Sequence, residues 1–301
     1  MIAIPNSGWI PDEPDPRDFG LDHPHVNALQ LPWAGTPMGA YRTLAAGELP
    51  PTVDLRPWFP PVVNQGMLPT CTACAVAGMV AYLRRRADGK LFAASRLFNY
   101  RTSRTLLGNP NMQGSQIRAA IASLALTGIP EERYWPYDPS QVDADPTPFC
   151  YAIASNSRTV RYFRIDQSLL TGAAYLDSVK RQLSGGLPVT IGFELYMSAL
   201  EAVKTGLIPV AQENDTKIGG HLVLAVGYDD AFSVPGAAVR STPTQGALLI
   251  RNSWGSEWGD SGYGWMPYEF FAKGLVSTSW IVTRQNWIDT TKFYLAPSAT
   301  K

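Results

Sequence analysis

Cysteine is scarce in this sequence, which has three, at positions 71, 74 and 150, among 301 residues. Such a small, odd number does not make a disulfide framework for a chain of this length, so a reducing compartment fits best. Excess charge is also lacking, because 25 Lys and Arg balance 25 Asp and Glu. Without a net field, neither nucleic acid nor an anionic membrane is an expected partner.

The first residues have neither a basic start nor a long apolar run, so no signal peptide or membrane anchor is evident. We therefore expect a cytoplasmic protein by default, with non-classical secretion left open. What the chain does have is apolar material: 45% of its residues are hydrophobic and 17% are charged. That composition is ample for the large core of a globular enzyme with two domains or two lobes.

Residues 1–50 are rich in proline and show no sustained helical or strand period. We interpret them as an extended amino-terminal arm. Its apolar points are expected to hold it against the folded body rather than leave it as a loose tail; they are Trp9, Ile10, Phe19, Leu21 and Trp33.

We expect the fold to be organised around residues 64–86, NQGMLPTCTACAVAGMVAYLRRR. Its apolar run from Cys71 has no polar face and predicts a buried helix. Thr70 is a preferred N-cap, so free N–H groups would surround the Cys71 sulfur and favour a nucleophilic thiolate. Gln65 offers an amide donor for an oxyanion nearby. The alternative is that Cys71 is simply a small buried hydrophobic residue.

Cys71 and Cys74 also form a C-x-x-C pair at a helix start, as in thiol–disulfide oxidoreductases. The Pro-rich segment before the pair does not look like the core strand of a small redox domain. A closed zinc site would need four ligands, and Cys150 is the one other cysteine, so no metal is expected.

Downstream, the pattern changes from helical to β-rich. Ser95 caps a predicted second helix, and a third runs over 116–126 and ends at Gly128. Residues 134–150 are rich in Pro and Asp and are predicted to be an irregular connection between lobes. After it, 159–165 and 188–196 are predicted strands, with a helix over 173–183 between them.

Two further strands, HLVLAVGYDD and GALLIRNSWG, flank a Pro-, Ser- and Thr-rich loop over 231–245. Paired as a hairpin, they bring His221 to Asn252. The amide would then fix the imidazole tautomer and leave the other ring nitrogen for a thiol. Trp254 would shield that bond from water, and Gly219 and Gly220 would leave room for a substrate backbone.

Over residues 53–280 the chain resembles the papain family of cysteine peptidases. The resemblance is carried by the segments VDLR…NQG…C…GGHLVLAVGY…IRNSWGSEWGDSGY. Gln65, six residues before Cys71, matches the family's oxyanion glutamine and selects Cys71 over Cys74 as nucleophile. Leu68 and Thr72 depart from the family's C-G-[SA]-C-[WY] pattern, so one family disulfide is absent.

The resemblance implies an α+β, papain-like two-lobed fold with the active site in the cleft. The expected arm comprises residues 1–50, and the expected catalytic domain comprises residues 51–301. Within that domain we expect a helical lobe at about 63–158 and a β-barrel-like lobe at about 159–301. The implied function is hydrolysis of peptide bonds, with catalytic Cys71, His221, Asn252 and Gln65. The implied substrate-binding residues are Gly114, Ser115, Ile117, Gly220, Leu222 and Trp254.

No cofactor is expected, and the partner is a peptide or protein substrate of a monomeric enzyme. The arm stands where the family has a propeptide, so we expect it to cover part of the cleft. Two other functions stay open at this point: a thiol–disulfide oxidoreductase that uses Cys74 as much as Cys71, and a catalytically silent peptide-binding protein on the same fold.

Overall fold

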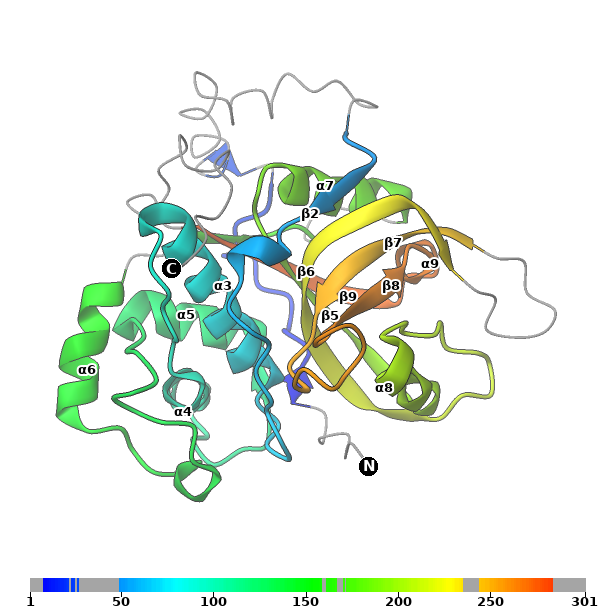
Figure 1. The fold of residues 1–301 in the computed structure, drawn as a ribbon. Coiled ribbons are helices and arrows are strands. Elements are labelled where there is room, and N and C mark those ends of the chain that lie inside the picture. Colours follow the sequence, from blue (N-terminus) through cyan, green and yellow to red (C-terminus); the bar gives the residue numbers. More distant parts are fainter. Residues whose placement is uncertain are drawn as a thin grey trace.

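The computed structural model describes residues 8–21, 23–24, 26, 49–158, 161–166, 170, 172–234 and 244–283. A group of helices lies on one side and a large antiparallel sheet on the other (Figure 1). The helical side holds α3 (Cys71–Asp88), α4 (Arg96–Leu106), α5 (Ile117–Thr127) and α6 (Pro148–Ala154). The mixed α+β class is confirmed.

The sheet runs in the order β4-β9-β5-β6-β7-β8, with β2 also paired to β6. Its strands are β2 (Thr52–Asp54), β4 (Arg161–Arg164), β5 (Val189–Tyr196), β6 (Lys217–Val234), β7 (Thr244–Arg251), β8 (Tyr263–Pro267) and β9 (Val276–Thr283). In this described part, no pairing joins the edge strands β4 and β8, so hydrogen bonds do not close the barrel-like lobe. Three helices lie between these strands in chain order: α7 (Ala173–Ser184), α8 (Ala202–Thr205) and α9 (Glu269–Ala272).

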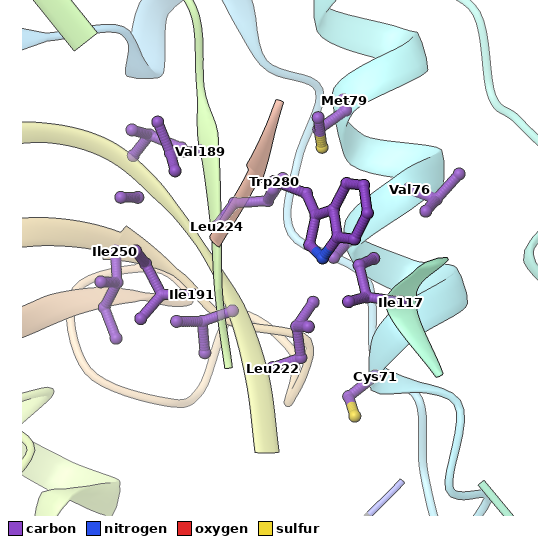
Figure 2. Close-up of a cluster of buried hydrophobic side chains, with 14 of the residues drawn as sticks. Cys71, Val76, Met79, Ile117, Val189, Ile191, Leu222, Leu224, Ile250 and Trp280 are labelled. Carbon is purple, nitrogen blue, oxygen red and sulfur yellow. The ribbon is translucent and has the colours of Figure 1, made fainter. Parts of the chain in front are cut away.

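Helix α3 is buried nearly all round, as its apolar sequence predicts. It packs on β6 on one side and on α4 and α5 on the other. Figure 2 shows the boundary, with Val76 and Met79 of α3 near Trp280, and Leu222 and Leu224 on β6. The helix ends at Gly89, whose left-handed φ of 74° suits glycine. No helix among the described residues is long and apolar enough to cross a bilayer.

The predicted hairpin is present as the antiparallel pair β6 and β7, with Leu224 opposite Arg251. Its strands extend into the predicted loop, because β6 runs to Val234 and β7 begins at Thr244. The prediction of a loop over 231–245 was therefore too long at both ends. Phe232, which was placed in that loop, stacks on Trp265 of β8 with 4.2 Å between ring centroids.

Residues 134–150 are not wholly irregular, which corrects a second expectation. They lead into α6, where the Thr147 hydroxyl accepts from the Cys150 amide and Pro148 occupies the first turn. A Thr N-cap followed by Pro is a helix-start signal, and the Pro and Asp content of the segment obscured it.

Candidate active site

Cys71 is the first residue of α3 and has no exposed surface. In Figure 2 its sulfur points away from the helix axis, towards the side where Leu222 of β6 lies. A cavity of about 10 Å³, the size of one water, lies beside it and is lined by Cys71, Leu222 and Asn252 among others. Thr70 occupies the N-cap position, but its hydroxyl makes no cap and instead bonds to the Tyr137 hydroxyl at 2.7 Å. We call this meeting of α3 and β6 the junction.

His221 and Asn252 meet as the hairpin predicts, with Nε2 and Oδ1 2.9 Å apart. The Asn252 oxygen also accepts from the Ser253 backbone N–H at 2.8 Å, so the amide cannot present its nitrogen there instead. The His221 Nε2 is therefore the protonated nitrogen, and Nδ1 is left for the thiol. The Trp254 ring stacks on the imidazole at 4.7 Å and helps to bury it.

The Gln65 side chain is held by two hydrogen bonds. Its Oε1 accepts from the Ser253 hydroxyl at 2.5 Å, and its Nε2 donates to the Leu68 carbonyl at 2.8 Å. The Gln65 backbone N–H also donates to the Ser253 carbonyl at 2.8 Å. The loop that carries the amide is thus fastened to the segment after β7, and one Nε2 hydrogen remains for an oxyanion.

The arm occupies the junction. Its strand β1 (Trp9–Ile10) pairs in parallel with β3 (Ser115–Gln116), and the Ser115 N–H donates to the Gly8 carbonyl at 2.8 Å. Gly8 lies so close to Pro69 that an added Cβ would stand 2.4 Å from its carbonyl. At Gly114, whose φ is 84°, a Cβ would lie 2.8 Å from the Gly8 oxygen. The main chain of the arm therefore lies against the residues predicted to bind substrate main chain.

Charged groups anchor residues 12–18 of the arm to both sides of the molecule. Asp18 pairs with Arg118 of α5 and, at 3.0 Å, with Arg164 of β4. Asp12 accepts from the Arg118 backbone N–H at 3.2 Å and from the Trp280 indole at 3.2 Å. Burial raises the pKa of Asp12 to about 6, against the opposing effect of Arg118.

With the arm in place, burial favours the neutral forms of Cys71 and His221, whereas the helix start alone would favour a Cys71 thiolate. Burial raises the pKa of Cys71 to about 12, although backbone hydrogen bonds from Leu222, Gly8 and Thr72 oppose the rise. Burial likewise lowers the pKa of His221 to about 4, while the bond to Asn252 acts in the other direction. Desolvation disfavours both charged forms and here exceeds the helix-start effect.

The other predicted site residues fall into two places. Ile117 and Leu222 face the junction from opposite sides (Figure 2), and Gly220 lies against the Trp9 ring. All ten predicted site residues thus lie around the junction or the arm. Their catalytic and binding roles stay predictions.

Three residues at the site were not predicted. Ser253 holds Gln65, and Tyr137 donates to the Gln65 carbonyl at 2.8 Å. Trp9 was expected only to hold the arm, yet it is almost fully buried, with 3% of its surface exposed, and its ring lies against Gly220. Ser253 directly follows Asn252, which was the available signal. For Tyr137 and Trp9 no local pattern existed.

Cys74 has a separate environment. Its sulfur lies 3.8 Å from the Thr70 hydroxyl, and all three cysteines are free. Burial raises the pKa of this thiol, so it is neutral at ordinary pH. Nothing about Cys74 marks it as a second redox-active sulfur.

This chain is similar to several known proteins. The sequence profile described as papain family cysteine protease matches residues 49–278. An uncharacterized peptidase C1-like protein of Acanthamoeba polyphaga mimivirus is 30% identical over 288 residues, which are 92% of this chain and 86% of that protein. Cathepsin K of Gallus gallus is 27% identical over 222 residues, and the match spans 59% of its length.

Among solved structures, xylellain, a cysteine protease from Xylella fastidiosa, superposes with a TM-score of 0.72 at 32% identity. The superposition covers 93% of this chain and 96% of xylellain. The similarity therefore includes the region before residue 49, which the family profile does not reach.

Proposed function

This chain belongs to the papain family of cysteine proteases, and from that premise we propose that it cleaves peptide bonds with Cys71 as nucleophile and is restrained by its own arm. The observation that carries the proposal is the convergence at the junction. Cys71 stands at the start of α3, and His221 is oriented at 2.9 Å by Asn252. Gln65 is held beside them by Ser253.

The proposed reaction begins with a proton shift from Cys71 to His221 Nδ1. The thiolate then attacks the substrate carbonyl, and the imidazolium gives its proton to the leaving amine. Water attacks the thioacyl group with His221 now acting as general base, which releases the acid and restores the thiol. Asn252 keeps the ring in the required tautomer in both steps.

The oxyanion of each tetrahedral intermediate would receive hydrogen bonds from the Gln65 amide and the Cys71 backbone N–H. The amide is preorganised because its oxygen is held by Ser253, so little reordering is needed at the moment of reaction. Removing one such donor costs about 3–4 kcal/mol in comparable enzymes.

The arm is the second part of the proposal. Its backbone covers Gly114 and Ser115, and it contributes to the burial that keeps Cys71 and His221 neutral. The Gly8 carbonyl accepts from the Ser115 N–H at 2.8 Å, so this segment occupies backbone hydrogen-bonding positions of a residue predicted to bind substrate. Such a segment blocks the site.

The nucleophile is tested with two substitutions. Cys71→Ala should abolish hydrolysis of a fluorogenic peptide, and an epoxide-type thiol inhibitor should label Cys71 in the unmodified protein. Cys74→Ala should keep most of the turnover. If Cys74→Ala were as inactive as Cys71→Ala, the oxidoreductase alternative would be favoured, and turnover by Cys71→Ala would rule out the peptidase assignment of this sulfur.

The arm is tested by deletion of residues 1–45. The kcat/KM for a fluorogenic peptide should rise in the shortened protein, with thermal unfolding used to verify that it is folded. Unchanged kinetics in a folded protein would count against the restraint. Monomeric state and cytoplasmic location stay predictions, and sedimentation and cell fractionation would test them.

A further inference from the structure

A cavity of about 220 Å³ lies between α3, the segment that leads into α4, and the end of β7. Helix α3 contributes four lining residues: Cys74, Ala77, Gly78 and Ala81. These positions recur at spacings of three and four residues, so they share one face of the helix. Because all four side chains are small, this face of α3 leaves the space open.

The lining of the cavity carries one positive charge that no carboxylate balances. Arg96 and Glu132 pair at 2.6 Å and offset each other. Arg251 is the third charged residue of the lining; it is 5% exposed and has no ion-pair partner among the described residues. Burial lowers the pKa of Arg251, and the Tyr263 hydroxyl acts in the other direction. A buried cation of this kind is unfavourable until an anion pairs with it.

The Arg251 guanidinium also keeps donors to spare. Its Nη1 donates to the Pro60 carbonyl at 2.8 Å and to the Tyr263 hydroxyl at 2.7 Å, and its Nη2 donates to the Pro61 carbonyl at 2.8 Å. Of the five N–H groups of a guanidinium, those on Nε and one on Nη2 therefore have no partner in the described part of the chain. The Nε atom borders the cavity wall, since a Cβ built on Gly78 would lie 3.7 Å from it.

We propose that this cavity binds a small apolar monocarboxylate, with its carboxylate on Arg251 and its apolar body against the small residues of α3. Charge complementarity selects a monoanion, and a guanidinium with unused N–H groups suits a carboxylate. A cavity of about 150 Å³ accepts benzene in another protein, so the larger volume here has room for a ring with a short carboxylate chain.

The site is distinct from the catalytic groups. Cys71, His221 and Gln65 are not among its lining residues. Val63, Cys74 and Arg251 line both this space and the smaller cavity beside Cys71. The site therefore borders the junction without including its reacting groups, and binding there does not depend on the proposed function.

The first experiment uses calorimetry on the full chain with four probes that separate charge from shape. They are 3-phenylpropanoate, the matching alcohol 3-phenylpropan-1-ol, the matching amine 3-phenylpropylamine, and acetate. The acid should bind more than tenfold more tightly than the alcohol, because hydrogen bonds to charged groups are the stronger ones. The amine should bind more weakly still, because it adds a second cation beside Arg251. Acetate should also bind more than tenfold more weakly than the acid, since it buries little apolar surface.

These four affinities decide the proposal without any substitution. Equal binding of the acid and the alcohol would contradict the role of Arg251. Equal binding of acetate and the longer acid would contradict the role of the apolar space. If the acid showed no saturable binding up to its solubility, the site itself would be refuted.

The second experiment places the acid in this cavity. Ala81→Leu fills the space from α3 and should weaken binding of the acid and the alcohol more than tenfold. Ala125→Leu is the control, because Ala125 is half-buried on α5 and does not line the cavity, and it should leave both affinities unchanged. Arg251→Gln should instead remove the preference for the acid over the alcohol. With folding verified by thermal unfolding, unchanged affinity for the acid in Ala81→Leu would show that it binds elsewhere and overturn the assignment.

Discussion

Trp9→Ala in the full chain should activate the enzyme by weakening the docked arm. A tryptophan side chain buries about 150–250 Å², and 3% of this one is exposed. At roughly 25 cal/mol per Å² its burial contributes about 4–6 kcal/mol, and large-to-alanine changes of this kind cost about 3–5 kcal/mol. Even the lower figure, about 3 kcal/mol, changes the ratio of open to docked molecules on the order of a hundredfold.

The kinetic signature distinguishes a docked arm from a damaged site. An arm that competes with substrate lowers the fraction of competent molecules, so it raises KM and leaves kcat unchanged at saturation. Trp9→Ala should therefore lower KM towards a plateau set by the fully open enzyme, with the same kcat. The assay is steady-state hydrolysis of one fluorogenic peptide, with active sites counted by an epoxide-type inhibitor.

Phe19→Ala is the control on the same arm, because Phe19 is 39% exposed and has less surface to lose. We expect it to change KM less than threefold. A folded Trp9→Ala protein whose KM equals that of the unmodified chain would refute the reasoning. A change in kcat at constant KM would mean that Trp9 acts on the chemical step instead.

Three more predictions follow from single contacts. Because burial raises the pKa of Asp12 to about 6 from 3.8, arm docking should be strongest below pH 4 and weaken as pH rises through 6; Asp12→Asn should remove this part of the pH profile of KM. Ser253→Ala should lower kcat/KM about tenfold by loosening Gln65, and Gln65→Ala should lower it on the order of a hundredfold or more, without a matching loss of thermal stability. Arg104, fully buried and bonded to the Met112 carbonyl at 3.1 Å, should cost about 3 kcal/mol of folding free energy when changed to Ala, measured by urea unfolding.

Elements specified by local pattern were predictable from the sequence. Helix α3 follows from an apolar run that begins after Thr70 and stops at Gly89. Ser95 caps α4 by accepting from the Phe98 N–H, as its position before an apolar face indicates. The approach of His221 to Asn252 follows from a hairpin, since two paired strands bring such ends together whatever their loop contains.

Features that depend on distant packing were not predictable in the same way. Trp9 meets Gly220 across more than two hundred residues of chain, and neither residue has a local signal for the other. The protonation of Cys71 depends on packing for a related reason. Its helix start favours a thiolate, but the burial of the junction, to which the arm contributes, outweighs that effect, and only the folded chain reveals it.

The pairing of the arm strand β1 with β3 has a consequence for how latency would persist. Because the arm and the site belong to one chain, the effective concentration of the arm at the site is of millimolar order and does not change on dilution. A separate inhibitor would dissociate when the protein is diluted, whereas the arm stays linked to its own site and can dock again after each release.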